Sequence, residues 1–150
     1  MRAVIQRVDH ASVEIDGQVH ASIRKGLLVL LGIEEADENH DIEWLAGKIA
    51  RLRIFDDEEG VMNLSVQDIR GEIMVISQFT LHASTKKGNR PSYIYAAKPD
   101  IAIPRYEHFI EEMKKQSDCE VASGVFGAMM NISLTNNGPV TIIIDSKIRW

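Results

Sequence analysis

Hydrophobic residues occupy every second position in two short runs near the start of the chain, Val13–Ile15 and Val19–Ile23. A period of two is typical of a β-strand with one buried face. Asp16-Gly17, which lies between the runs, is a common two-residue hairpin turn. The pattern therefore predicts a β-hairpin over residues 12–23.

Three further segments have the pattern of strands. Leu27–Leu31 is apolar at every position and predicts a central strand buried on both faces. Ile73–Ser77 predicts a second buried strand. Residues from Val121 to Ile144 predict further strands, interrupted by the turn residues Asn136–Pro139.

Two segments repeat their hydrophobic residues at helical spacing, from about Glu38 to Arg53 and from about Pro104 to Gln116. The stripes comprise Ile42, Leu45, Ile49 and Leu52 in the first segment and Tyr106, Phe109, Ile110 and Met113 in the second. Asp37 or Asn39 can cap the first helix, and Pro104 suits the first turn of the second. Strands before, between and after two helices predict an α+β fold, mostly antiparallel, with helices on one side.

Composition limits the class of protein. The chain of 150 residues predicts a single domain spanning residues 1–150. The net charge of −5 argues against bulk capture of nucleic acid but leaves room for a small RNA contact. The longest apolar run, Leu27–Leu31, is too short to span a bilayer, and the first ten residues lack the apolar core of a signal peptide. With one cysteine, we expect a cytoplasmic protein.

Most common catalytic signatures are missing from the sequence. It has no Gly-x-Ser-x-Gly elbow, phosphate-binding Walker loop or dinucleotide fingerprint. Its five histidines lack metal-ligand spacing, so we expect surface or hydrogen-bonded histidines, no metal site and no cofactor. Cys119 lies between two acidic residues that raise a thiol pKa, which argues against an activated thiolate. The acidic run Asp56–Glu59 predicts a solvated turn.

Three polar segments are candidates for function, and each also has an ordinary structural interpretation. Ser77–Leu81 offers donors and acceptors without a general base, or it is a strand whose hydroxyls face a neighbour. Gly88–Tyr93, just after Lys86-Lys87, is a cationic loop that can bind an anion or simply face solvent. Asn136–Thr141 is a plain turn, or it contains a cis peptide before Pro139, which would point two neighbouring carbonyl groups in nearly the same direction.

Together these segments resemble one family. Ser77–Leu81 resembles the Ser-Gln-Phe-Thr-Leu motif of D-aminoacyl-tRNA deacylases, and Asn136–Thr141 resembles their Asn-x-Gly-Pro-Val-Thr motif. Met1–Val8, Gly88–Ser92 and Gly124–Met129 are similar too, in family order along the whole chain. Tyr93 departs from the pattern, where a phenylalanine is expected.

The resemblance implies a two-sheet, barrel-like α+β fold in a homodimer with its active sites at the interface. Gly138-Pro139, in the cis form, is expected to reach from one subunit into the pocket of the other. The implied reaction is hydrolysis of the ester between a D-amino acid and the terminal adenosine of tRNA. Glycine mischarged on a non-cognate tRNA is the expected second substrate.

The resemblance also assigns roles to residues. Thr80, Gln78 and Phe79 are the catalytic candidates, acting through N–H groups that bind the oxyanion and through Gln78, which orients the ester or water. The 2′-hydroxyl of the terminal ribose assists. The alternative makes Thr80 the nucleophile, with His82 on the same strand face as its base.

The expected substrate contacts are Ser77, Gly138, Pro139, Met129, Phe126 and Arg7, and the expected tRNA contacts are Lys86, Lys87 and Arg90. Gly138 and Pro139 carbonyls would reject the L-enantiomer by collision, with Arg7 holding them. Arg7 could instead extend to solvent, and Phe79, Phe126 and Met129 could be core residues.

Two rival functions follow from the same resemblance. A related deacylase could clear an L-amino acid from a non-cognate tRNA, although relatives of that type carry altered versions of both motifs. A non-catalytic homologue could bind charged tRNA and leave the ester intact. The weak basic character of the chain argues against a general RNA-binding module.

Overall fold

Strand β1 (Arg2–Ile15) organises the main sheet of the protein. In the computed structural model, which describes residues 1–149, β1 pairs antiparallel with β2 (Gln18–Ile23), β3 (Gly26–Gly32) and β8 (Asn131–Asp145). The predicted hairpin is confirmed, because β1 and β2 are joined by Asp16 and Gly17 with φ of 52° and 76°. Both angles suit the tight turns that match strand twist.

The centre of the sheet is mixed rather than antiparallel. Strand β3 pairs parallel with β6 (Glu72–Ser77), and β6 pairs parallel with β7 (Val121–Ser123). The order is β2-β1-β3-β6-β7, with β8 also on β1, and β4 (Phe55–Asp56) and β5 (Met62–Leu64) form a small second sheet. The predicted burial of Leu27–Leu31 is confirmed except at Leu30, which is half-buried, because apolar side chains cover both faces of β3.

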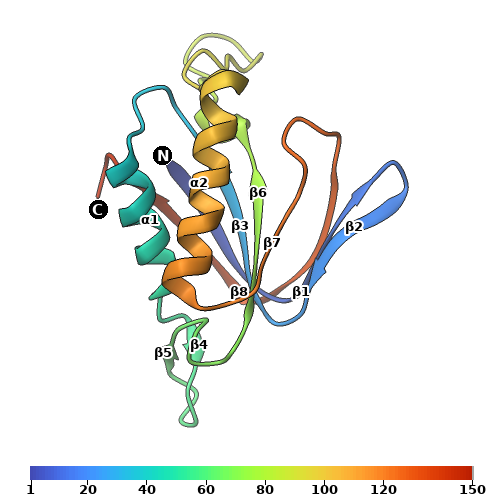
Figure 1. The fold of residues 1–150 in the computed structure, drawn as a ribbon, viewed down its shortest axis with the longest axis vertical. Helices are drawn as coiled ribbons and strands as arrows, with labels where there is room; N and C mark the ends of the chain where they lie inside the picture. Colours follow the sequence, from blue (N-terminus) through green and yellow to red (C-terminus); the bar gives the residue numbers. More distant parts are fainter. Residues whose placement is uncertain (150) are drawn as a thin grey trace.

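Helices α1 (Asn39–Ala50) and α2 (Pro99–Ser117) lie side by side over one face of this sheet (Figure 1). Leu45 and Phe109 from the helices are buried in one cluster with Val29. A second cluster, which includes Val13 and Leu28, fills the other face where the sheet curls. The fold is therefore α+β and barrel-like, with helices on one side, as the sequence predicts.

The ends of both helices differ from the prediction. Helix α1 begins after Glu38, whose N–H donates to the Asp41 side chain at 2.9 Å, while Asp37 instead binds the α-amino group of Met1. Helix α2 begins at Pro99, so Pro104 lies inside the helix and not in its first turn. Pro99 supplies the fixed φ that a first helical position favours, which lets the helix start five residues early.

Asn136–Pro139 does not interrupt the last strand. Strand β8 runs without a break from Asn131 to Asp145, and β1 pairs with it on both sides of this segment. The ladder shifts register opposite Gln6–Val8 and Val8–His10. Such shifts are bulges, which bend a strand and redirect its side chains. Neither helix in residues 1–149 combines the length and apolar character needed to cross a membrane.

Candidate active site

The Ser77–Leu81 segment lies at the carboxyl end of β6. Ser77 is the last residue of that strand, and the chain then turns into a short 3-10 helix, Phe79–His82. The interpretation of this segment as an ordinary strand is therefore wrong beyond Ser77. The main-chain N–H of Gln78 donates to Leu31 O at 2.7 Å, which fixes the turn to the end of β3.

Neutral groups dominate this turn. The Gln78 side-chain amide donates to Thr80 Oγ1, so these two predicted catalytic side chains are in contact. Phe79 and Thr80 are the first residues of the 3-10 helix, where N–H groups lack intrahelical partners. The turn can therefore bind an oxyanion through main-chain donors, with no ionisable side chain among Ser77–Leu81.

His82 does not face Thr80 in this arrangement. Residues two positions apart in a 3-10 helix lie about 240° apart around its axis, whereas in a strand they share a face. The imidazole is buried and lies against Gly32 of β3. The expectation that His82 shares a face with Thr80 is thus wrong. The expectation of a surface or hydrogen-bonded histidine is also wrong at His82, because its buried Nε2 has no hydrogen-bond partner within residues 1–149.

Two of the predicted active-site side chains, Phe79 and Met129, are exposed. Phe79 is 53% exposed and meets the Tyr93 ring edge-on with centroids 5.0 Å apart. Met129 is 90% exposed, so the core interpretation is wrong for both Phe79 and Met129.

Phe126 is partly buried, and its ring centroid lies 5.8 Å from that of Tyr106. Burial raises the Tyr106 pKa to about 12, and its hydroxyl donates to Val75 O of β6 at 2.8 Å. Phe126 therefore rests on a neutral, anchored phenol near the end of β6.

The segment around Gly138-Pro139 is exposed, and a buried side chain beneath it holds it in place. The Gly138-Pro139 bond is cis, as the resemblance implies, and both residues are exposed. Arg7 is buried beneath them and donates to Asn137 O at 3.2 Å and Ile54 O at 2.7 Å. The interpretation of Arg7 as a solvent-facing side chain is therefore wrong. A Cβ on Gly138 would lie 2.9 Å from Arg7 Nη2, so the guanidinium and this glycine are in close contact.

Two more residues, Asn136 and Asp56, contact this segment or Arg7, and neither is given this role from the sequence. The Asn136 side-chain amide donates to Arg7 O at 3.0 Å and to Val140 O at 2.9 Å, spanning Gly138-Pro139. Asp56 lies 3.3 Å from Arg7 Nη1. The motif itself pointed to Asn136, but the acidic run that contains Asp56 was interpreted only as a solvated turn.

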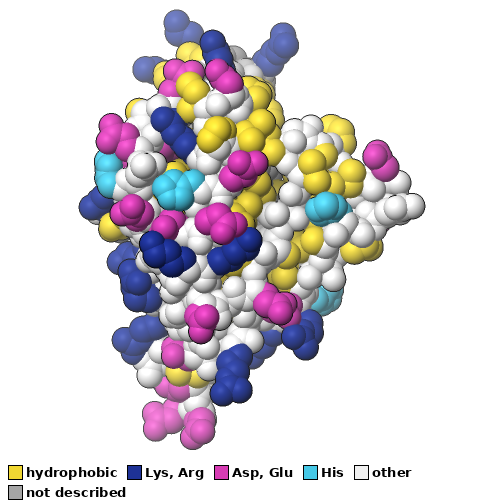
Figure 2. Space-filling view, in the orientation of Figure 1, with side chains coloured by type: hydrophobic (Ala, Val, Ile, Leu, Met, Phe, Trp, Pro, Cys, Tyr) yellow, Lys and Arg dark blue, Asp and Glu magenta, His cyan; other side chains and the backbone are white. Residues whose placement is uncertain are grey.

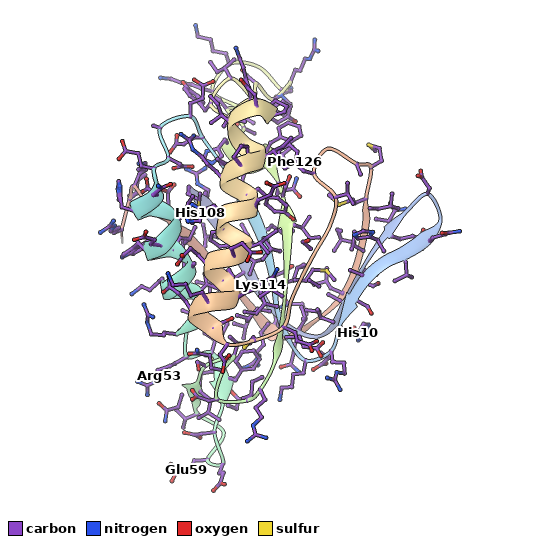
Figure 3. All side chains as sticks on the ribbon, in the orientation of Figure 1. His10, Arg53, Glu59, His108, Lys114 and Phe126 are labelled. Atoms are coloured by element: carbon purple, nitrogen blue, oxygen red, sulfur yellow. The ribbon has the colours of Figure 1, made fainter. Side chains whose placement is uncertain are left out.

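Within one chain the two segments lie far apart. Gln78 is bonded to Leu31 at one end of β3, whereas Arg7 pairs with Leu27 toward the other end. Four residue steps along β3 separate Leu31 from Leu27, a distance of about 13 Å. In Figure 3, Phe126 lies beside the upper part of α2, and Glu59, at the tip of the hairpin that carries Asp56, lies at the opposite end. One chain therefore does not bring Gly138-Pro139 to Thr80.

The predicted RNA contacts share a loop beside the first segment. Lys86, Lys87 and Arg90 are all exposed on it, and paired main-chain bonds between Ser84 and Ser92 close the loop at 2.8 and 2.9 Å. Figure 2 shows Lys and Arg side chains extending from this end of the molecule. The loop therefore presents positive charge close to the Phe79–His82 turn.

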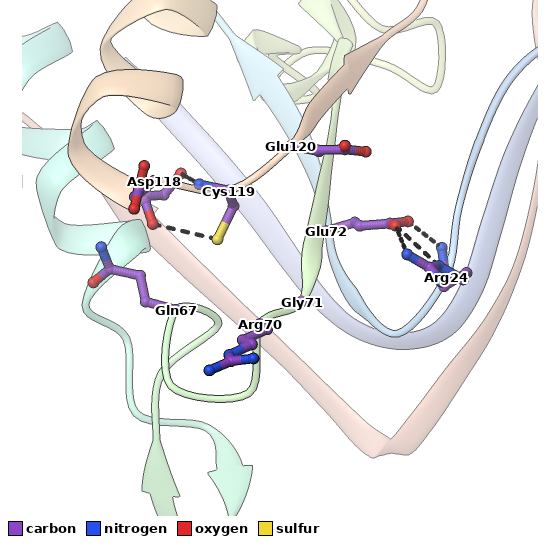
Figure 4. Close-up of a pocket in the computed structure, with 9 residues that line it drawn as sticks. Arg24, Gln67, Arg70, Gly71, Glu72, Asp118, Cys119 and Glu120 are labelled. Carbon is purple, nitrogen blue, oxygen red and sulfur yellow. Dashed lines mark hydrogen bonds and ion pairs between the residues drawn. The ribbon is translucent and has the colours of Figure 1, made fainter.

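A cavity of about 550 Å³ lies at the other end of β6 (Figure 4). Two of its charged side chains pair with each other, since Arg24 Nη2 lies 2.7 Å from Glu72 Oε1. Hydrogen bonds from the Arg24 main-chain N–H and then from its guanidinium lower the Glu72 pKa. Burial, aided by Asp118, raises the pKa of the Cys119 thiol there, in the predicted direction. The cavity lies at the end of β6 opposite Ser77 and offers no activated nucleophile.

Comparison with known proteins identifies close relatives over the full length. The sequence model of the family described as D-Tyr-tRNA(Tyr) deacylase matches residues 4–145. The chain is 67% identical over 147 residues to a D-aminoacyl-tRNA deacylase of Parabacteroides distasonis, covering 98% of each protein. It is 62% identical over 149 residues to that of Flavobacterium johnsoniae, covering 99% of each.

Solved structures agree with the fold. A protein titled c-Myc DNA Unwinding Element Binding Protein superposes with a TM-score of 0.90 at 39% identity, covering 97% of this chain and 98% of that one. A probable eukaryotic D-amino acid tRNA deacylase superposes with a TM-score of 0.81 at 15% identity, covering 95% and 97%. At that lower identity the likeness concerns the fold alone.

Proposed function

Because this chain belongs to the D-Tyr-tRNA(Tyr) deacylase family, we propose that it hydrolyses the ester of D-aminoacyl-tRNA and releases a free D-amino acid and tRNA. The observation that carries this proposal is the partly exposed Gln78–Thr80 turn, which offers donors but no ionisable side chain. An aminoacyl ester is already reactive, so positioning and oxyanion binding suffice to speed its hydrolysis. The reaction needs no cofactor and belongs in the cytoplasm, where charged tRNA is used.

The catalytic turn acts through its main chain. N–H groups of Phe79 and Thr80 bind the oxyanion of the tetrahedral intermediate, and Gln78, held by Thr80, orients the ester or the attacking water. The 2′-hydroxyl of the terminal ribose relays the proton. We disfavour Thr80 as nucleophile, because Thr80 Oγ1 accepts the Gln78 bond and His82 faces Gly32.

Gly138-Pro139 acts as the chiral filter, from a second copy of the chain. The separation of the two segments within one protomer supports this division of the site between subunits. The two carbonyls occupy the space that an L-side chain needs and accept bonds from the substrate α-amino group. The exposure of the pair, and the support of Arg7 and Asn136 beneath it, suit a rigid surface that enters a partner's pocket.

Glycine follows as a second substrate. It has no side chain to collide with the carbonyls, so the filter passes it. A D-side chain points outward, and the enzyme therefore accepts D-amino acids of many sizes.

The RNA end of the substrate lies over the first segment. Ser77 borders the ester, while Phe79, Phe126 and Met129 form walls for the terminal adenine. Exposed aromatic faces bind bases by stacking. Lys86, Lys87 and Arg90 contact phosphates of the acceptor stem, so binding weakens as salt rises.

The deciding experiment measures release of tyrosine from D-tyrosyl-tRNA and L-tyrosyl-tRNA under the same conditions. The proposal predicts fast hydrolysis of the D-ester and almost none of the L-ester. Equal rates would exclude a chiral filter, and preference for an L-ester would favour the rival L-amino acid deacylase. Binding of charged tRNA without hydrolysis would identify a non-catalytic homologue.

A further inference from the structure

A cavity of about 490 Å³ lies directly behind the proposed catalytic turn. Its wall is formed by the residues that follow the Ser77–Leu81 motif, from His82 to Lys86, and by Arg2, Glu34 and Tyr95. One residue, Leu81, separates Thr80 from His82, so their Cα atoms lie at most about 7 Å apart. The cavity is thus a neighbour of the proposed ester site, on the side where the cationic loop begins.

Most groups around this cavity donate hydrogen bonds. The Arg2 guanidinium contacts Asp145 through Nε and Nη2, each at 3.0 Å, and donates to Leu81 O through Nη1 at 2.7 Å. These contacts use three of the five N–H groups of a guanidinium, which leaves two for a ligand. Lys86 adds an exposed ammonium, and Ser84 and Thr85 add hydroxyls.

The one carboxylate in the cavity wall, Glu34, shares a cation with a second carboxylate. Glu34 Oε1 lies 3.7 Å from the α-amino group of Met1, which also binds Asp37. His82, also in the wall, is 6% exposed and its Nε2 has no hydrogen-bond partner within the described residues. That atom is shielded from solvent and packs against Gly32, so it is not offered to a ligand. The remaining donors of Arg2 and Lys86 favour a ligand rich in acceptor atoms.

We propose that this cavity binds the phosphodiester that joins the last two nucleotides of the substrate RNA. The assignment rests on the proposed function, which positions the terminal ribose at Thr80. The phosphate on the 5′ side of that nucleotide lies one ribose away from the ester, which matches the step from Thr80 to His82. Arg2 and Lys86 bind its anionic oxygens, and charged hydrogen bonds of this kind are short and strong. Lys86 thereby contacts the terminal linkage, which leaves Lys87 and Arg90 for the acceptor stem.

Binding of a dinucleotide tests the cavity without requiring catalysis. Cytidylyl-adenosine and its methylphosphonate analogue carry the same bases, but only the first has a charged linkage. Calorimetry should show that the protein binds the phosphodiester about tenfold more tightly than the neutral analogue. Lys86→Glu should remove this preference. Lys98→Glu, an exposed lysine outside the cavity wall, should retain it.

Equal affinity of the unaltered protein for both dinucleotides would overturn the assignment, as would full preference in Lys86→Glu. A dinucleotide has no acceptor stem, so a loss in Lys86→Glu cannot arise from stem contacts. Binding of inorganic phosphate with no preference between the dinucleotides would also overturn it. Hydrolysis of the D-tyrosyl esters of both dinucleotides distinguishes failure of the phosphate assignment from failure of the proposed function. If neither ester is cleaved, the proposed function fails, whatever the dinucleotide affinities show.

Discussion

At the scale of single residues, the proposed catalytic turn, Gln78–Thr80, combines main-chain donors with neutral side chains. Gln78 and Thr80 bind each other, and the nearest histidine in sequence faces away. A site of this kind can stabilise charge but cannot remove a proton by itself. The proton must therefore move through water or through the substrate, which assigns a chemical role to the terminal ribose.

Thr80→Ala and a 2′-deoxy terminal adenosine separate the two candidate mechanisms. With RNA assistance, Thr80→Ala should lower kcat by about tenfold or less, because it removes only the support of Gln78. With the unaltered enzyme, the rate of hydrolysis of the 2′-deoxy substrate should be at least about a hundredfold lower than that of the normal substrate. Single-turnover hydrolysis of D-tyrosyl-tRNA measures both. A collapse of several orders of magnitude in Thr80→Ala, with a fully active deoxy substrate, would make Thr80 the nucleophile.

Asn136 is the residue whose loss should relax chiral selection. Asn136→Ala removes two bonds, to Arg7 O and Val140 O, that hold the chain on either side of Gly138-Pro139. The ratio of D-tyrosyl to L-tyrosyl hydrolysis should fall by about tenfold. This ratio is insensitive to the amount of folded enzyme. Asn131→Ala, at an exposed position of the same strand, is the control and should leave the ratio unchanged.

At the scale of elements, the start of α1 is fastened to the end of the chain. Asp41 is buried and accepts bonds from the Glu38 N–H at 2.9 Å and from Lys147 Nζ at 2.6 Å. Burial favours the neutral acid, but these hydrogen bonds outweigh it and lower the Asp41 pKa to about 2. The same contact raises the Lys147 pKa.

The lowered pKa predicts how stability depends on pH. Asp41 ionises more readily in the folded state, so its contribution is complete above its unfolded pKa of about 4 and is lost as pH falls toward 2. The contribution at neutral pH is about 2 kcal/mol. Asp41→Asn should therefore flatten the fall of the urea midpoint between pH 4 and pH 2. Glu35→Gln, at an exposed neighbouring position, should keep the steep fall; a steep fall in Asp41→Asn would contradict the assignment.

Elements with an uninterrupted period were predictable, and those set by a distant partner were not. The β1–β2 hairpin and β3 follow from alternation and from continuous burial. Asn136–Pro139 has the composition of a turn, but β1 is long enough to pair on both sides of it, so the strand continues. The Phe79–His82 turn was not predictable, because the contact that ends β6 before it is a hydrogen bond from the Gln78 N–H to Leu31 O, and Leu31 is remote in sequence.

The same distinction holds for the candidate site. Both motifs were recognisable from sequence, because their residues are contiguous. The contacts of Asp56 with Arg7, and of His82 with Gly32, join residues separated by dozens of positions, and no local pattern announces them.

At the scale of the whole molecule, one chain carries the two halves of the proposed site at opposite ends of β3. Strand β8 pairs with β1, and within residues 1–149 no strand covers its other edge. Hydrophobic side chains are also visible between α2 and the strands that curl away from it (Figure 2). Unpaired edges and exposed apolar surface commonly mark association surfaces. A symmetric dimer would bring each half site to its complement twice.

Mixed dimers of two inactive variants test this division of the site most directly. Phe79→Pro removes a main-chain donor from the catalytic turn; proline suits a first helical position, and Gln78 before it has an extended φ of −142°. Gly138→Ala displaces the other half, because its Cβ would lie 2.8 Å from Val140 Cγ2. Each variant should form inactive dimers, verified by light scattering and thermal unfolding.

Unfolding the two variants together and refolding them at equal concentration should restore D-tyrosyl-tRNA hydrolysis to about a quarter of the unaltered level. Half of the dimers are then mixed, and each mixed dimer has one intact site composed of both chains. If the mixture stays as inactive as its parents although mixed dimers form, each site belongs to a single chain, and the account of a filter supplied by the partner is wrong.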